Sequence, residues 1–398
     1  MKRQNIPSAL LAGFPCAGQF IQRFGHYNLR HAATVACLVL IAGCSSGNNS
    51  SDNTQAAVTP FQELYDQGID RYLGKYSPML NETEGDVVTH TFGGGDGPLC
   101  LNGGEYRMAT RDKGSSELLI FLVGGGVCYP GVCFVEYPDG ERGIPALGVL
   151  DTALPGNPLA SWTTVYLPYC DGGFHISDAD SDSNGDGQID RYQRGLRNLS
   201  AALDVAVATF PSPSRIVLAG QSAGGLGASF ALPLVRKLYP DVPIDVINDS
   251  GLGLIATGSA QITRSLFDEW NAGAFFPASC STCITADGYL TGYHKWQLGQ
   301  DSNVRLGMLS FKQDFNFANF LFASAEQFEK SLVEELSELE DSYPDQMHSF
   351  LANGTAHTFL LNGIAIENAL QVEAGGVSAI DWVSAMLSGS PDWVSTSD

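Results

Sequence analysis

The clearest hydrophobic pattern in the chain is a short apolar run followed by an apolar repeat at helical spacing. Residues 215–219 (Arg-Ile-Val-Leu-Ala) are an apolar, β-branched stretch of the kind that forms a buried parallel strand. Apolar residues then recur at helical spacing until Pro240: Leu226, Phe230, Leu234 and Leu238. Residues 220–224, Gly-Gln-Ser-Ala-Gly, lie between the two segments. The pattern therefore predicts a strand, a sharp turn and a helix.

Other apolar runs alternate with helical patterns, which is typical of an α/β protein. The remaining expected strands are residues 87–92, 105–110, 118–123, 163–166, 244–247, 304–311 and 347–351, the last of the sheet. The first two of these alternate polar and apolar residues, so we expect them as extra antiparallel edge strands. Expected helices are residues 61–72, 192–209 and 324–341, the last opened by a capping box of Ser324 and Gln327. Residues 266–296 are aromatic-rich without clean periodicity, and we interpret them as a helical cap that walls a pocket.

Ser222 stands at the centre of the turn, in a G-x-S-x-G pattern. Such a short pattern arises by chance in a chain rich in glycine and serine, so the flanking strand and helix carry the prediction. In that setting the turn pushes the serine out above the sheet, where its hydroxyl is placed to act as a nucleophile. The alternative is a glycine-rich connection whose serine is incidental.

Three consecutive glycines follow the most strongly apolar strand. Residues 118–123 run directly into Gly124, Gly125 and Gly126. Glycines allow the backbone to turn its N–H groups toward one point, as an oxyanion hole requires. The alternative is a tight turn without a catalytic role.

A serine hydroxyl becomes nucleophilic when a histidine takes its proton, and that imidazole needs a carboxylate to orient it. In α/β hydrolases the order along the chain is serine, acid, histidine, each on a loop after a strand. His357 follows the strand at residues 347–351, whereas His348 lies inside it, so His357 is the predicted base. Asp314 and Asp249 each follow a strand and compete for the role of acid. Asp314 fits the usual position more closely, while Asp249 would instead organise the turn beneath the serine.

The first 43 residues read as a lipoprotein signal peptide. They carry four basic and no acidic residues, and their apolar run over residues 32–42 is too short to span a bilayer permanently. Residues 40–44, Leu-Ile-Ala-Gly-Cys, resemble the bacterial lipobox, so Cys44 is expected to be lipidated. We expect a polar tether over residues 44–57 and one catalytic domain over residues 58–398. Because serine follows Cys44, we expect an exported outer-membrane lipoprotein, periplasmic or on the cell surface; a plain secretory peptide is the alternative.

The formal net charge of the 398 residues is −22, and removal of the four leader cations makes it more negative. Such a charge argues against nucleic acid as a partner. It also disfavours tight binding of a polyanion unless the cleft is locally basic, whereas neutral esters and sugars meet no such conflict. A hydrophobic content of 44% suffices for one large core.

Six cysteines remain once Cys16, Cys37 and Cys44 are set aside, and an even number in an exported chain predicts three disulfides. Cys280 and Cys283 have the CxxC spacing, but no second such pair or histidine cluster accompanies them. Zinc is therefore not expected.

Residues 182–190 carry oxygen-bearing groups at alternate positions, as a calcium-binding EF-hand loop does. The expected ligands of a structural Ca²⁺ are Asp182, Asn184, Asp186, the carbonyl of Gln188, and Asp190. Gln193 stands where such a loop has its bidentate glutamate, so the site would be half-formed and weak, with Asp178 or Asp180 as candidates for the missing carboxylate. The alternative is a solvated acidic loop. No cofactor is expected for catalysis.

Several motifs, taken together, resemble the pectin acetylesterase and Notum carboxylesterase family. They span about residues 95–360 in the family's order: residues 124–128, 169–172, 194–195, 220–225, 249–251, 314 and 357. The resemblance implies an α/β-hydrolase fold, with a mostly parallel central sheet flanked by helices. It also implies hydrolysis of carboxylic esters by Ser222, Asp314 and His357.

The same resemblance implies further details of the site. It places the oxyanion donors at the backbone N–H groups of Gly126, Val127 and Ala223. It implies three disulfide pairs: Cys100 with Cys170, Cys128 with Cys133, and Cys280 with Cys283. Val127 stands where the family usually has tryptophan, next to the acyl pocket, so the family's preference for acyl size does not carry over.

The sequence thus predicts a serine ester hydrolase that removes acetyl or other short acyl groups from a saccharide or similar extracellular substrate, such as an acetylated polysaccharide. The lipid anchor would be its link to a membrane. One alternative is a polyester depolymerase or lipase-like esterase, which needs a broad apolar rim around the cleft. Another is a catalytically inactive, calcium-binding surface lipoprotein.

Overall fold

The computed structural model describes residues 59–398, apart from residues 130–131, 255–257, 321–322, 362–365 and 367. The described residues belong to one compact unit. The predicted signal peptide, the tether over residues 44–57 and three cysteines (Cys16, Cys37 and Cys44) lie outside the described residues. Within the described part of the chain, no helix is both long and apolar enough to cross a bilayer.

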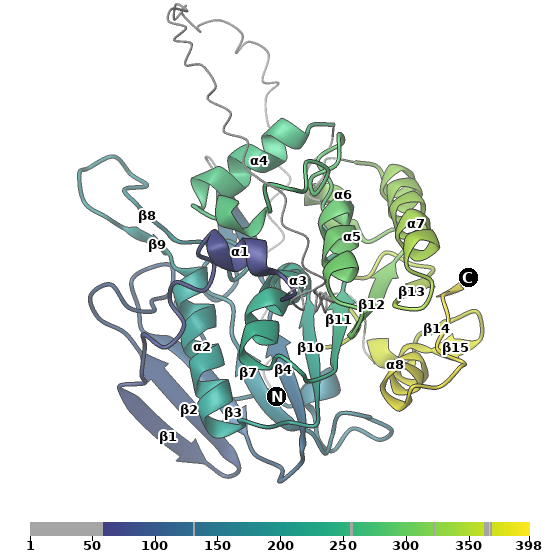
Figure 1. The fold of residues 1–398 in the computed structure, drawn as a ribbon, viewed down its shortest axis with the longest axis horizontal. Helices are drawn as coiled ribbons and strands as arrows, with labels where there is room; N and C mark the ends of the chain where they lie inside the picture. Colours follow the sequence, from purple (N-terminus) through teal and green to yellow (C-terminus); the bar gives the residue numbers. More distant parts are fainter. Residues whose placement is uncertain (1–58, 130–131, 255–257, 321–322, 362–365, 367) are drawn as a thin grey trace, which may run out of the picture. The chain divides into compact units, whose positions relative to one another are not determined.

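A ten-stranded sheet runs through the unit (Figure 1). Its strands, in spatial order, are β1 (Leu80–Glu84), β2 (Val87–Phe92), β3 (Tyr106–Arg111), β7 (Thr163–Leu167), β4 (Glu117–Leu122), β10 (Arg215–Gln221), β11 (Ile244–Asp249), β12 (Val304–Phe311), β13 (Met347–Ala352) and β16 (Thr396–Ser397). Neighbouring strands are parallel from β7 to β16, while β1, β2, β3 and β7 pair antiparallel in sequence. The predicted mixed sheet with a parallel centre is confirmed.

Helices pack around this sheet. The α-helices of the described residues are α1 (Gln62–Asp66), α2 (Gly195–Thr209), α3 (Ala223–Leu238), α4 (Ala260–Glu269), α5 (Thr291–Gln300), α6 (Phe315–Phe320), α7 (Ala325–Ser342) and α8 (Ala379–Ser388). Short 3₁₀ turns occupy Gly148–Leu150, Gly273–Phe275 and Ala369–Gln371. Three small hairpins complete the fold: β5 (Gly126–Tyr129) with β6 (Val132–Val135), β8 (Ala179–Ser181) with β9 (Arg191–Gln193), and β14 (Glu373–Ala374) with β15 (Val377–Ser378). In Figure 1 the β8–β9 hairpin projects away from the sheet.

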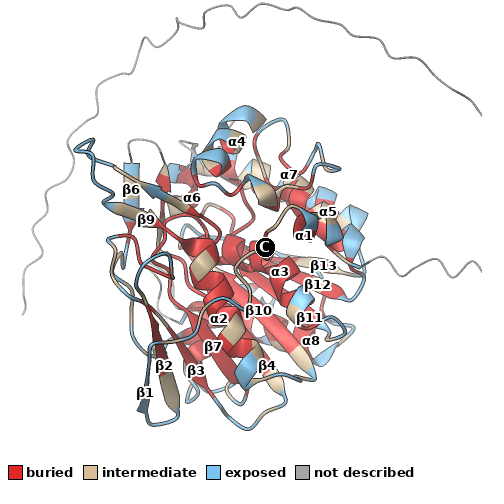
Figure 2. Ribbon diagram, turned by 60° about the vertical axis from the view of Figure 1, so that its left-hand side comes forward, coloured by how far each residue is buried: buried red, intermediate tan, exposed pale blue. Residues whose placement is uncertain are grey.

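The core lies where the central parallel strands meet α2 and α3, which are buried in Figure 2. Strands that are buried on both faces need apolar side chains on both faces, and this explains why β4 and β10 are continuous apolar runs in the sequence. The expected capping box opens α7, since Ser324 and Gln327 exchange side-chain to backbone hydrogen bonds. The most regular sequence patterns thus correspond to the most buried elements.

The predictions fail at the margins of the sheet. The expected helix over residues 61–72 is a single turn, α1, followed by turns. Strand β1 was not predicted because all of its residues are exposed, which leaves no apolar alternation to detect. It covers the edge of β2, and β3 lies between β2 and β7, so neither of the two predicted edge strands lies at an edge.

Two further boundaries differ from the prediction. The helix expected from residue 192 begins at Gly195, because residues 191–193 pair with residues 179–181 as a hairpin. Strand β13 is not the last of the sheet, since the short β16 pairs with it in parallel. Two residues are too few to form a sequence pattern.

Candidate active site

Ser222 occupies the turn between β10 and α3, at the carboxyl edge of the sheet. Its backbone φ is +55°, a value that side chains other than glycine seldom adopt. The turn is tight because Gly224 lies against the end of β4, where a Cβ atom would stand 2.1 Å from the carbonyl oxygen of Leu122. The N–H of Ser222 donates to the carbonyl oxygen of Asp249 at 2.7 Å. The fold therefore holds this serine in a strained, fixed conformation, as at a nucleophile elbow.

His357 and Asp314 lie together although 43 positions separate them. His357 follows β13 and Asp314 follows β12, and the two strands are neighbours in the sheet. The Nδ1 atom of His357 lies 2.7 Å from Oδ2 of Asp314. Since a carboxylate only accepts, Nδ1 carries the proton and Nε2 is left as the acceptor.

The carboxylate of Asp314 is fully buried, and its other oxygen accepts the N–H groups of Asn316 and Phe317. These bonds fix the orientation of the carboxylate toward the imidazole. His348, the alternative histidine, lies within β13 and contacts Ser395 instead. Of the two candidate acids, Asp314 is therefore the one that bonds to His357.

Asp249, the other candidate acid, holds the histidine loop by its backbone. Its fully buried carboxylate accepts the N–H groups of Phe359 at 2.8 Å and Leu360 at 2.7 Å. Burial raises the pKa of Asp249 to about 6. Because its own carbonyl oxygen accepts the N–H of Ser222, Asp249 bonds the serine turn and the histidine loop to each other.

A second bond between the same two segments was not predicted. The hydroxyl of Thr358 donates to Oε1 of Gln221 at 2.8 Å. Gln221 precedes the serine, and Thr358 follows the histidine with a φ of +73°. The sequence carries no signal for this contact, because a threonine and a glutamine on two distant loops have no shared pattern.

The glycine-rich turn after β4 packs directly against the serine turn. At Gly124 a Cβ atom would lie 2.4 Å from the carbonyl oxygen of Gln221 and 2.8 Å from Cβ of Ser222, so glycine is required there for the close approach. The next residues, Gly126 and Val127, line one cavity together with Ser222 and Ala223. Their donation to an oxyanion stays a prediction, supported by this placement.

Two cavities meet at Ser222. One is apolar and has a cavity volume of about 60 Å³; its walls include Val127, Phe174, Leu254, Leu266 and Phe317. The other, the open cavity, has a larger volume of about 480 Å³, and its walls include His357 and Gln221. Ser222, Gly126 and Phe320 line both.

The predicted cap contributes little of the pocket wall. Leu266 of α4 lines the apolar cavity, but the aromatic rings of the segment mainly pack on one another and on Phe230 of α3. Phe267, Trp270 and Tyr293 are buried in this way. Most of the aromatic content of residues 266–296 is therefore core.

Three disulfides join the pairs that the resemblance implies: Cys100 with Cys170, Cys128 with Cys133, and Cys280 with Cys283. The second bridges facing residues of the β5–β6 hairpin. The N–H of Cys128 also donates to the carbonyl oxygen of Gly172 at 2.8 Å. The hairpin that continues from Gly126 is thus fixed to the Tyr-Cys-Asp-Gly turn.

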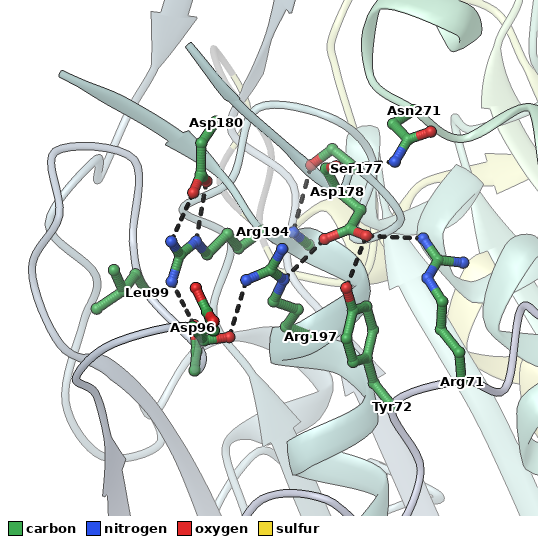
Figure 3. A network of polar contacts seen from close by, with 12 residues as sticks. Arg71, Tyr72, Asp96, Leu99, Ser177, Asp178, Asp180, Arg194, Arg197 and Asn271 are labelled. Carbon is green, nitrogen blue, oxygen red and sulfur yellow. Dashed lines mark hydrogen bonds and ion pairs between the residues drawn. The ribbon is translucent and has the colours of Figure 1, made fainter. Parts of the chain in front are cut away.

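A polar network anchors the base of the β8–β9 hairpin (Figure 3). Asp178 accepts from Arg71 and Arg197, and Arg194 binds both carboxylate oxygens of Asp180. Burial opposes ionisation of Asp178, but the bonds from Arg71 and Arg197 outweigh it and lower its pKa. Asp178 and Asp180 are therefore engaged by arginines, and their suggested role as calcium ligands stays a prediction.

The predicted calcium loop connects β8 to β9. Its side-chain oxygens accept backbone N–H groups of the same loop: Asp182 from Gly185, Asp186 and Gly187, and Asp186 from Gln188. Asp190 accepts the N–H and hydroxyl of Ser183. Across the residues that the structure describes, no three acidic, histidine or cysteine side chains are gathered as a metal site. Calcium binding stays a prediction.

The parallel sheet and the nucleophile-type turn after its central strand define the class of this protein: it is an α/β hydrolase. The family model described as pectinacetylesterase, a family of carboxylic ester hydrolases, matches residues 93–273 of the chain. The match includes Gly124–Val127 and Ser222 and ends before Asp314 and His357. No curated protein matches the chain.

Proposed function

We propose that Ser222, His357 and Asp314 form the catalytic triad of a serine hydrolase that removes acetyl or other short acyl groups from a saccharide or similar substrate. The observation that carries this proposal is the His357–Asp314 bond of 2.7 Å, formed at the edge of the cavity that Ser222 lines. The match to the pectinacetylesterase family model supports ester hydrolysis independently of this geometry.

The reaction has two steps. Nε2 of His357 takes the proton of Ser222 Oγ as Oγ bonds the ester carbonyl carbon, and the same proton then passes to the alcohol oxygen as the carbon–oxygen bond breaks. Water next attacks the acyl-serine, with His357 again as base, and releases the carboxylic acid. The buried Asp314 keeps the proton of the neutral imidazole on Nδ1 and stabilises the imidazolium. The N–H groups of Gly126, Val127 and Ala223 would stabilise the oxyanion of each step.

The proposed location is outside the cytoplasm, with Cys44 as the lipidated first residue of the mature chain. Three disulfides in a chain of this size support an oxidising compartment. Catalysis needs no cofactor in this proposal. A Ca²⁺ ion, if bound by residues 182–190, would act on the stability of the β8–β9 hairpin.

The proposal is tested by acetate release. The purified protein is incubated with a chromogenic acetyl ester and with a panel of acetylated polysaccharides, beside the Ser222→Ala variant. We expect hydrolysis of the chromogenic ester and of at least one polysaccharide, both lost in the variant. A folded wild-type protein that releases no acetate from any of them would contradict the proposal.

A second candidate, an esterase acting on apolar or polymeric esters, is favoured by the rim of the open cavity. Phe134, Leu147 and Phe320 line it and are 61%, 48% and 42% exposed. Exposed apolar side chains around a cleft suit adsorption to an apolar surface. Turnover of an insoluble polyester film in preference to soluble acetyl esters would favour this second candidate.

A further inference from the structure

Only one of the two cavities at Ser222 is lined by His357, and this residue determines in which cavity the alcohol leaves. In the proposed reaction His357 must donate a proton to the departing alcohol oxygen, so that oxygen has to lie beside the imidazole. His357 lines the open cavity, and it is absent from the residues that line the apolar one. The alcohol part of the ester therefore belongs in the open cavity, and the acyl part in the apolar one.

The open cavity carries negative charge. Glu136 and Glu141 line it, and no lysine or arginine is among its lining residues. The parts of residues 59–398 that the structure does not describe contain no lysine or arginine either. Arg142, next to Glu141 in sequence, pairs with Glu82 of β1 at 3.0 Å. No described cationic side chain of the wall therefore offsets the two carboxylates.

Aromatic rings lie in the same wall. Tyr166 and Tyr137 line the cavity, and the hydroxyl of Tyr166 donates to Glu141 at 3.3 Å. Carboxylates attract a cation directly. The ring of Tyr137, which is 43% exposed, can add an attraction through its quadrupole, whereas Tyr166 is buried. A uronate chain would instead bring its own carboxylates against Glu136 and Glu141, which is unfavourable.

We propose that the alcohol side of this cleft rejects anionic alcohols, including the uronate chain that the family's name suggests, accepts neutral ones and prefers those with a positive charge. The proposal rests on the proposed function, because it needs His357 as the general acid. It follows from the cavity in which His357 lies and from the two carboxylates that line that cavity. The favoured substrates are acyl esters of neutral sugars, of amino sugars or of quaternary amino alcohols.

The test compares acetate esters that differ in the charge of the alcohol. The three probes are the acetates of choline, of neohexyl alcohol, which is its uncharged carbon isostere, and of isethionate, which is anionic. For each protein, kcat/KM of each charged ester is divided by that of the neohexyl ester. Ratios compared between variants cancel the intrinsic reactivity of each ester and any general loss of catalysis.

The variants are the double substitution Glu136→Gln and Glu141→Gln and, as a control for net charge, the single substitution Glu117→Gln. Glu117 begins β4, at the opposite edge of the sheet from Ser222, so its removal changes the net charge without changing the cleft. We expect the double substitution to lower the choline ratio and raise the isethionate ratio, each by about tenfold, and added salt to act in the same direction. The control should leave both ratios unchanged.

Each outcome separates the two proposals. If wild-type protein hydrolyses all three esters and the double substitution leaves the ratios unchanged, the charge proposal is wrong while the esterase stands. The same conclusion follows if acetylated pectin is hydrolysed faster than acetylated xylan. If wild-type protein hydrolyses none of the esters, chromogenic ones included, the proposed function itself fails.

Discussion

Replacing each of the two buried aspartates by asparagine should give opposite results. In Asp314→Asn the amide has no charge to stabilise the imidazolium that forms in each step, and its NH₂ group favours the wrong tautomer of His357. The measured effect of such a change in a serine triad is a loss of about 10⁴ in kcat, and we expect a loss of ~10³ or more here. The folded state should survive, because an amide oxygen still accepts the N–H groups of Asn316 and Phe317.

Asp249→Asn should keep most of the activity. One oxygen of Asp249 accepts both backbone bonds from the histidine loop, and an asparagine oxygen accepts them equally well. The new NH₂ group then faces Ser250, whose hydroxyl now donates to the carboxylate at 3.2 Å and would rotate to accept. We expect a loss in kcat of less than about tenfold. Asp249→Ala, by contrast, leaves two buried N–H groups unpaired, at about 1–3 kcal/mol each.

The stability of the wild-type protein and that of Asp249→Asn should also depend differently on pH. The folded pKa of Asp249, about 6, lies above the ordinary value of 3.8, so the folded state binds the proton more tightly. The stability due to this proton is complete below the ordinary pKa and is lost as pH rises through about 6. The loss is about 3 kcal/mol, at 1.36 kcal/mol per pKa unit. The Asp249→Asn variant avoids this loss, because its amide cannot ionise.

The assays are steady-state kinetics on a chromogenic acetyl ester and urea unfolding in acid and at neutral pH. Relative to wild type, Asp249→Asn should gain about 3 kcal/mol in the free energy of unfolding between these conditions. If Asp249→Asn lowers kcat as much as Asp314→Asn, the assignment of the acid is wrong. If the difference in free energy does not change with pH, the raised pKa of Asp249 is refuted.

Three other predictions concern the framework. The disulfides of Cys100 and Cys128 close loops that span 70 and 5 positions, so the loss of loop entropy in the unfolded chain stabilises the protein by about 4 and about 2 kcal/mol. Removing the first disulfide should therefore lower the urea midpoint more than removing the second. The reverse order would contradict this prediction. Calorimetric titration of chelator-stripped protein should show weak Ca²⁺ binding that Asp186→Asn abolishes; no heat at millimolar Ca²⁺ would leave residues 182–190 as an acidic surface loop. Cys44→Ser should move the protein out of the membrane fraction, and a mature N-terminus without lipid would show that the lipobox is misread.

The central sheet was predictable because burial on both faces forces apolar runs such as those of β4 and β10. The serine, acid and histidine positions followed from the ends of β10, β12 and β13, which lie at one edge of the sheet. Sequence alone left Asp249 and Asp314 as alternatives, because both follow strands. Only the folded structure distinguishes them. Asp314 hydrogen-bonds the imidazole of His357, whereas Asp249 accepts a backbone N–H group of the residues that follow His357.

Contacts between unrelated loops were not predictable in the same way. The carboxylates of Glu136 and Glu141 come from a segment without regular structure, and only the folded chain places them in the cavity with His357. The sequence did indicate that the charge of the cleft would matter, because a strongly negative protein binds an anionic substrate tightly only if its cleft is locally basic. In the structure two carboxylates line the open cavity and no described lysine or arginine does, so the charge of this cavity is negative.

The most direct test of the account is whether Ser222 is the nucleophile. Wild-type protein treated with a fluorophosphonate should gain the mass of one adduct, and peptide mapping should place that adduct on Ser222. Ser222→Ala should gain no adduct and lose ester turnover by orders of magnitude, since only the oxyanion hole would remain. An adduct on another residue, or turnover by Ser222→Ala within about tenfold of wild type, would contradict the account.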